Sequence, residues 1–206
     1  YDLLVLGAPP DTSFTKRLLG TDRDKLTEQA TCSVLRLKTS KVSTKHPSLI
    51  QQITPAEDPH GILHFIDDSC AQARINITKK EALFTHIAES FSRSHPKLDT
   101  AAVEKALWER EKAQNTSIGL GIALPHATLA DAEETLLGVF TTETPIDYSS
   151  PDGSKIDLFF VTIGPPRARQ THLVLLSTLS RMIVSEGFAQ SIRSSETSTE
   201  LLEVLG

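Results

Sequence analysis

The sequence has few cysteines, few aromatic residues and no excess of positive charge. Only two of its 206 residues are cysteines, Cys32 and Cys70, and they lie too far apart for a C-x-x-C metal or redox motif. We therefore expect free thiols in a reducing cytoplasm and no metal site. Acidic residues outnumber lysine and arginine by 26 to 21, which gives a formal net charge of -5. This balance argues against a nucleic-acid-binding surface.

Long apolar runs and several catalytic fingerprints are also missing. The longest strongly apolar run, Ile156 to Ile163, contains an aspartate and is far shorter than the roughly 20 residues that a membrane helix needs. There is no Gly-x-Ser-x-Gly elbow, and Gly119-Leu-Gly121 lacks the third glycine of a dinucleotide fingerprint. The sequence therefore favours neither acyl transfer nor dinucleotide binding, and we expect no cofactor.

What the sequence does contain is a hydrophobic pattern that predicts two parts joined by a linker. Residues 1–38 carry apolar runs at 3–6 and 32–37 on either side of a helical pattern, which is the order of a βαβ unit. Residues 39–61 are rich in Ser, Thr, Lys and Pro and are predicted to form the linker. A complete second domain is expected over residues 62–206.

The second domain alternates helical and strand patterns. Thr78-x-x-Glu81 is a capping box that predicts the start of a helix, and Asp99 and Thr197 are further predicted N-caps. The other predicted elements are a short strand at 122–124, strands at 136–141 and 156–163, and a helix over about 170–183. This order predicts an α/β fold.

One histidine, His126, is presented by an unusual local sequence. Gly119 and Gly121 permit a bend or a close approach of the backbone, and the apolar residues that follow them predict a short buried strand. Pro125 is expected to end the strand pairing just before His126. His126 is therefore a candidate nucleophile, but a strand-end histidine bonded to a backbone group explains the local pattern equally well.

A second histidine, His172, falls in the first turn of the predicted long helix, just after Pro165-Pro166. Unpaired N–H groups and the helix dipole favour anions at such a position. A partly exposed polar residue on an amphipathic helix is the alternative. Neutral histidine is a competent nucleophile near pH 7 and arginine can neutralise phosphoryl oxygens, so the residue types fit transient phosphoryl carriage.

Several motifs of the second domain follow one another in a characteristic order. They are Arg110, Thr116, Gly119, Gly121-Ile-Ala-Leu-Pro-His126, Glu143-Thr-Pro-Ile146, Asp157-Leu-Phe-Phe160 and Thr171-His-Leu173. This order resembles the enzyme IIA domains of the bacterial phosphotransferase system, of the mannitol, fructose and nitrogen-regulatory type. The resemblance covers about residues 62–206 and implies a mixed central sheet flanked by helices on both faces.

The resemblance also implies roles for four residues. His126 would accept a phosphoryl group through Nε2 from the histidine phosphocarrier protein, and His172 would support the acceptor or its phosphoryl group. Arg110 would stabilise charge, and Thr116 would donate a hydroxyl hydrogen bond. Members usually carry glycine directly after the histidine, whereas this chain has Ala127 there.

The first part has a resemblance of its own. Asp2-Leu-Leu-Val-Leu-Gly7, Lys16-Arg-Leu-Leu-Gly20-Thr21 and Ala30-Thr-Cys-Ser-Val-Leu35 are similar to the C-terminal third of a universal stress protein domain. ATP-binding members use glycines whose N–H groups approach the phosphates, and Pro10 occupies the second of these glycine positions here. We therefore expect no ATP binding.

The two parts together resemble the cytoplasmic tails of bacterial secondary transporters, including amino-acid permeases and cation/proton antiporters. The resemblance implies a cytoplasmic module, tethered through a membrane transporter that it regulates. A regulatory or scaffolding module that acts without phosphorylation stays open as an alternative. Because a lone βαβ unit exposes sheet edges, a homodimer is also expected.

Overall fold

The computed structural model describes residues 3–8, 33–38 and 62–206. The chain separates into two units, Tyr1–Thr54 and Pro55–Gly206. In the first unit, strands β1 (Leu3–Ala8) and β2 (Ser33–Lys38) pair in parallel, the arrangement that a βαβ order predicts. The helix predicted between them and the predicted linker lie outside the described residues.

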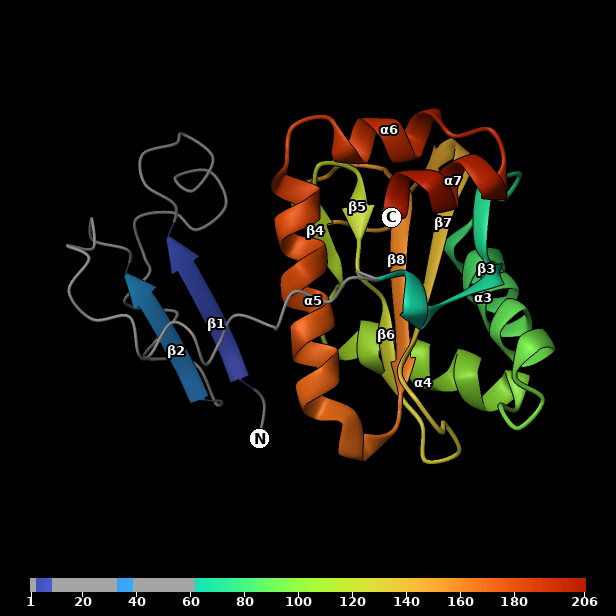
Figure 1. The fold of residues 1–206 in the computed structure, drawn as a ribbon, viewed down its shortest axis with the longest axis horizontal. Helices are drawn as coiled ribbons and strands as arrows, with labels where there is room; N and C mark the ends of the chain where they lie inside the picture. Colours follow the sequence, from blue (N-terminus) through green and yellow to red (C-terminus); the bar gives the residue numbers. More distant parts are fainter. Residues whose placement is uncertain (1–2, 9–32, 39–61) are drawn as a thin grey trace. The chain divides into compact units, whose positions relative to one another are not determined.

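The second unit is built on a six-stranded mixed sheet (Figure 1). Its strands are β3 (Ile66–Ile75), β4 (Ser117–Gly119), β5 (Ile122–Ala123), β6 (His126–Thr128), β7 (Leu136–Ile146) and β8 (Ile156–Gly164). Their order is β3-β7-β8-β5-β4, and β6 also pairs with β8. β7 and β8 are antiparallel, whereas β5 and β6 both run parallel to β8. The predicted mixed sheet is confirmed.

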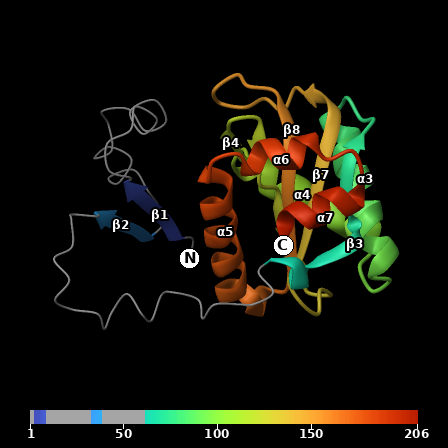
Figure 2. The same cartoon turned by 45° about the horizontal axis from the view of Figure 1, so that its top comes forward.

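Helices cover both faces of this sheet, as predicted. They are α3 (Lys80–Ser94), α4 (Thr100–Ala113), α5 (Arg169–Val184), α6 (Phe188–Ser194) and α7 (Ser198–Leu205). Helices α3 and α4 lie behind the sheet in Figure 1, and α6 and α7 lie in front of it; Figure 2 shows the same two layers from another direction. The described residues contain no helix that is long and apolar enough to cross a membrane.

Strand β8 shows why its apolar run is continuous. Successive side chains of a strand point to opposite faces of the sheet. Phe159 and Val161 pack in the core that α3 and α4 cover, whereas Leu158 and Phe160 pack in the core that α5 to α7 cover. Because both faces are buried, the strand shows no alternation of polar and apolar residues and is apolar along most of its length.

The predicted helix caps have mixed outcomes. Asp99 accepts a hydrogen bond from the N–H of Ala102 at 2.9 Å, and Thr197 accepts one from Glu200, so both predicted caps are confirmed. The capping box at Thr78 is wrong, because α3 begins later, with an extended Lys79 as its N-cap and no side-chain cap. The first residue of α3, Lys80, pairs with Glu111 at 2.7 Å, and the apolar face of the helix is buried.

Candidate functional site

A tight turn delivers the strand that carries the site. Gly119, Leu120 and Gly121 all have positive φ, at 84°, 58° and 75°, and they reverse the chain from β4 to β5. Only glycine adopts this region without strain, and a Cβ on Gly121 would lie 2.8 Å from Nη2 of Arg193. The two glycines of the motif are therefore required by the bend and by a close approach.

Pro125 interrupts the strand pairing but does not end it, so that prediction is wrong. β5 pairs with β8 up to Ala123, and pairing with β8 resumes at His126, which is in register with Thr162. The carbonyl of Pro125 accepts a hydrogen bond from the N–H of Thr162 at 3.0 Å. Proline lacks a donor but keeps its acceptor, so the chain stays on the sheet and places His126 at a fixed point along β8.

The hydrogen bonds of His126 fix its tautomer. Its Nδ1 lies 3.0 Å from the carbonyl oxygen of Leu124, which can only accept, so Nδ1 carries the proton. Nε2 then holds the lone pair, and Nε–H of Arg110 donates to it at 2.8 Å. The ring is partly buried and presents Nε2 as its nucleophilic atom. His126 is thus bonded to a backbone group, as one of the two alternatives predicts. Its role as a nucleophile stays a prediction.

Arg110 reaches this ring from the last turn of α4. Its Nη1 donates to the carbonyl oxygen of Gln114 at 3.0 Å, while its Nε donates to His126. The first bond ties the guanidinium to the end of the helix and leaves its other N–H groups for a second acceptor. A phosphoryl group on Nε2 would take the place of the lone pair and bring its oxygens to these donors.

His172 lies beside His126, although 46 residues of sequence separate them. The two ring centroids are 5.2 Å apart. Nδ1 of His172 is 3.3 Å from the hydroxyl of Thr162, the residue in register with His126. The first turn of α5 therefore brings His172 to His126, and the structure groups His126, His172 and Arg110.

Both histidines of the pair are neutral near pH 7. Burial lowers the pKa of His126, and the Arg110 guanidinium lowers it further, against the raising effect of the Leu124 carbonyl and Glu111. Burial lowers the pKa of His172 to about 4, with His126 and Arg110 adding to the shift. A neutral imidazole is the nucleophilic form of histidine, and burial favours this form for both rings.

A small cavity of about 100 Å³ opens next to His172. Its walls include Thr128, Gly164 and the start of α5 at Arg169. It lies along the ends of β6 and β8. His172 is thus bordered by a recess at a helix N-terminus, an environment that favours anions.

Thr116 does not join the histidine pair through its side chain. Its hydroxyl donates to Oε2 of Glu111 at 2.5 Å and contacts the Tyr148 hydroxyl at 3.0 Å, inside the protein. Its backbone carbonyl accepts from the N–H of Leu124 at 2.9 Å. The predicted hydroxyl donation from Thr116 to the acceptor stays a prediction, and in this structure that hydroxyl serves Glu111.

Sequence reasoning missed three groups at or near the site. The Leu124 carbonyl is a backbone group, so the residue type does not indicate its role. Thr162 lies within a largely apolar strand, and its spacing does not mark its hydroxyl as part of a site. Glu111 follows Arg110 on a helix rich in charge, so nothing in the sequence marks it as buried. Only register and packing reveal all three.

The described residues also bear on two other kinds of site, metal sites and reactive thiols. Within the described residues, no cluster of three or more His, Cys, Asp or Glu side chains is arranged to hold a metal ion. Cys70 is buried on β3, and burial raises the pKa of its thiol to about 12, so it is inert near pH 7.

Comparisons with known families and curated proteins agree with this geometry. Residues 64–206 match the family model of the phosphoenolpyruvate-dependent sugar phosphotransferase system, EIIA 2. The nitrogen regulatory protein of Pseudomonas aeruginosa is 30% identical over 126 residues, which cover 61% of this chain and 82% of that protein. The nitrogen regulatory protein of Bradyrhizobium diazoefficiens is 34% identical over 105 residues, covering 50% of this chain and 68% of the relative.

Solved structures share the fold. Nitrogen regulatory protein IIA-Ntr from Neisseria meningitidis superposes with a TM-score of 0.66 at 26% identity, covering 70% of this chain and 99% of that one. The mannitol IIA protein of Escherichia coli superposes with a TM-score of 0.55 at 17% identity, covering 67% and 97%. At that identity the second likeness concerns the fold alone.

Proposed function

The chain belongs to the EIIA 2 family of the phosphoenolpyruvate-dependent sugar phosphotransferase system, and we propose that it accepts a phosphoryl group on Nε2 of His126. One observation carries the proposal: Nδ1 of His126 is bonded to the Leu124 carbonyl, which leaves the lone pair on Nε2 beside Arg110. The proposed donor is a phosphohistidine of the histidine phosphocarrier protein.

In the proposed transfer, a P–N bond forms to Nε2 as the P–N bond to the donor nitrogen breaks. The electron pair of the broken bond stays on the donor nitrogen. The Nδ1 proton of His126 remains in place, and the Leu124 carbonyl stabilises the positive charge that the ring acquires. Arg110 moves its N–H from Nε2 to the phosphoryl oxygens, while neutral His172 offers a further N–H donor to them.

We propose that the added phosphoryl charge, roughly two negative units, acts as a signal for a partner. The relatives with the highest identity quoted above are named nitrogen regulatory proteins, which supports a regulatory role over a metabolic one. The partner we propose is a membrane transporter to which this module is tethered on the cytoplasmic side. The sequence order of a stress-protein-like part before the family domain supports this assignment.

The test is phosphorylation in vitro with phosphoenolpyruvate, enzyme I and the phosphocarrier protein, followed by mass measurement of the intact chain. The wild type should gain one acid-labile phosphoryl group and His126→Ala should gain none. His64→Gln, which alters an exposed histidine of the same unit, is the matched control and should be phosphorylated normally. A wild type that gains no adduct would contradict the proposal and favour a module that acts without phosphorylation.

A further inference from the structure

Glu111 is the only charged side chain that is buried among residues 62–206, at 6% exposure. It directly follows Arg110 on α4, yet the transfer described above gives it no task. Removing a carboxylate from water is costly unless its oxygens are fully paired. Its position next to the site and its complete pairing call for an explanation.

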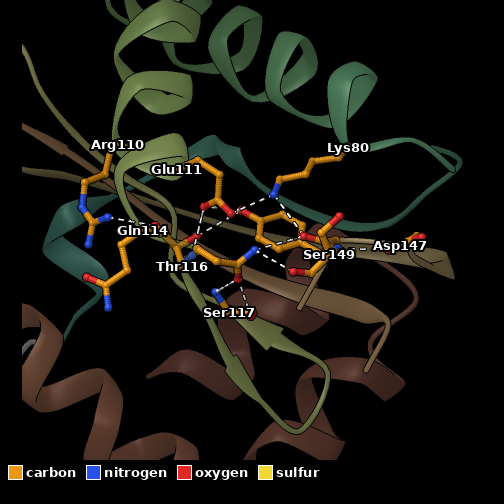
Figure 3. Close-up of polar contacts among 10 residues, drawn as sticks. Lys80, Arg110, Glu111, Gln114, Thr116, Ser117, Asp147 and Ser149 are labelled. Carbon is orange, nitrogen blue, oxygen red and sulfur yellow. Dashed lines mark hydrogen bonds and ion pairs between the residues drawn. The ribbon is translucent and has the colours of Figure 1, made fainter. Parts of the chain in front are cut away.

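The two carboxylate oxygens of Glu111 receive four hydrogen bonds (Figure 3). Oε1 accepts from Nζ of Lys80 at 2.7 Å. Oε2 accepts from the N–H and the hydroxyl of Thr116, at 3.1 and 2.5 Å, and from the hydroxyl of Tyr148 at 3.1 Å. The side chain of Lys80 is only 13% exposed, and it also donates to the carbonyl oxygen of Tyr148 at 3.1 Å. Glu111 thus joins α3, α4, the start of β4 and the segment between β7 and β8.

Two routes lead from this carboxylate to the imidazole of His126. The first is the backbone of α4, because Arg110 is the neighbouring residue and its Nε donates to Nε2 of the ring. The second is a chain of hydrogen bonds. Glu111 holds Thr116, the carbonyl of Thr116 accepts from the N–H of Leu124 at 2.9 Å, and the carbonyl of Leu124 accepts from Nδ1 of His126 at 3.0 Å. The two routes end on the two nitrogens of one ring.

We propose that Glu111 is a positioning residue for phosphoryl acceptance, holding the partner of each nitrogen of His126 at once. This rests on the proposed function of His126. Because Glu111 sets both Arg110 and the Leu124 carbonyl, it fixes the ring's orientation and keeps the proton on Nδ1. Thr116 belongs to this device: its hydroxyl acts through Glu111 and not on the phosphoryl group.

A purely structural ion pair would act differently. Apolar residues of similar volume can replace a purely structural ion pair without loss of stability. Replacing such a pair would not change the tautomer of a histidine. Misplacing a reacting group by about 1 Å costs transfer rate on the order of 100-fold while leaving the fold intact. The tautomer of His126 is therefore the measurement that distinguishes positioning from scaffolding.

The experiment compares Glu111→Gln, Thr116→Val and Tyr148→Phe with the wild type in the full chain. Glu133→Gln is the matched control, because Glu133 pairs with Lys97 at 2.6 Å on the surface, both side chains being 71% exposed. Imidazole ¹⁵N chemical shifts report the tautomer of His126, and initial rates with the phosphocarrier protein report acceptance. We expect Glu111→Gln to raise the Nε2–H fraction and slow acceptance roughly 10- to 100-fold, the two milder variants to do so in smaller measure, and the control to do neither.

Each outcome of this experiment supports or overturns the positioning role of Glu111. A folded Glu111→Gln variant with the wild-type tautomer and rate would overturn the positioning role. If Glu111→Gln does not fold, Thr116→Val and Tyr148→Phe provide the test. Wild-type tautomer populations of His126 in both of them would overturn the positioning role. If the wild type accepts no phosphoryl group but the tautomer still follows Glu111, the proposed function fails and the positioning of the ring stands. If Thr116→Val accepts the phosphoryl group more slowly but keeps the wild-type tautomer of His126, the Thr116 hydroxyl contacts the phosphoryl group directly. That result would overturn the proposal that Thr116 acts through Glu111.

Discussion

The short distance between His126 and His172 predicts that a negative charge at position 126 will raise the pKa of His172. The perturbation is His126→Glu, a stable substitute for one charge of a phosphoryl group, compared with the neutral variant His126→Gln. The rings are 5.2 Å apart, and burial, His126 and Arg110 lower the pKa of His172 to about 4. A negative charge at this distance favours the protonated form of His172, so its pKa must rise.

The size of the rise follows from the distance. At an effective dielectric constant of about 20, a unit charge about 5 Å away contributes roughly 3 kcal/mol, which corresponds to about 2 pKa units. Arg110 will pair with the new carboxylate and cancel part of this effect, so we expect a rise of about 1 to 2 units. His172 should then titrate about 1 to 2 pH units higher in His126→Glu than in His126→Gln. Phosphorylated wild type should show at least the shift of the carboxylate variant, because its charge is larger.

Proton NMR of the imidazole Cε1–H signals over about pH 4 to 8 measures these midpoints. The His172 signal is identified by its loss in His172→Asn. His86 of α3 is the internal control, since burial lowers its pKa and its Nε2 contacts Gln72, so its midpoint should be the same in both variants. Equal midpoints for His172 in the two variants would refute the reasoning, because the rings would then not be electrostatically coupled.

Three further predictions concern stability, each measured as the free energy of unfolding in urea. The lowered pKa values of His126 and His172 mean that the unfolded chain binds more protons than the folded chain below about pH 6.5. The free energy of unfolding should therefore fall as the pH drops from there towards about 4. The double variant His126→Gln/His172→Asn should lose stability less steeply, and an equal slope would contradict this. Asp99→Ala removes the N-cap of α4 and should cost about 1 kcal/mol; no loss would show that the cap bond is not formed in solution. Gly121→Ala imposes positive φ on alanine and places Cβ against Arg193, so we expect a loss of roughly 1 to 3 kcal/mol, and a neutral result would mean that the turn relaxes freely.

The elements that were predicted well are those in which one physical pattern dominates. The helix predicted at about 170–183 is α5, because its leucines recur at helical spacing. The predicted strands at 136–141 and 156–163 lie within β7 and β8, whose side chains are buried along most of their length. Hydrophobic burial is strong, local in sequence and periodic, so it can be read without a structure.

The elements that were missed lack such a pattern. β3 is ten residues long, yet its sequence IDDSCAQARI shows little β-branched or alternating character. It is an edge strand, held by main-chain bonds to β7 that any residue can make. Helix α6 has seven residues, too few to display a helical period. Pairing with neighbours decides both, and neighbours are not visible in a local window.

The candidate site divides in the same way. The order of motifs predicted that His126, His172 and Arg110 belong together, and the structure brings them together from three separate elements. In our proposal, what prepares His126 is a backbone carbonyl and a buried carboxylate linked to the ring through three hydrogen bonds, neither of which a motif encodes. Sequence order identifies the groups that perform chemistry, but the groups that orient them depend on register and packing.

Ala127 shows how structure changes the meaning of a departure from a family pattern. Glycine after the histidine suggests a backbone that needs positive φ, in which case alanine would be strained. Ala127 instead lies within β6, in register with Ile163, and its φ is not positive. Its side chain is 7% exposed and belongs to the core on the side of α3 and α4. The alanine therefore adds apolar packing next to His126 in the chain without requiring positive φ, and it is compatible with the proposed phosphoryl acceptance by His126.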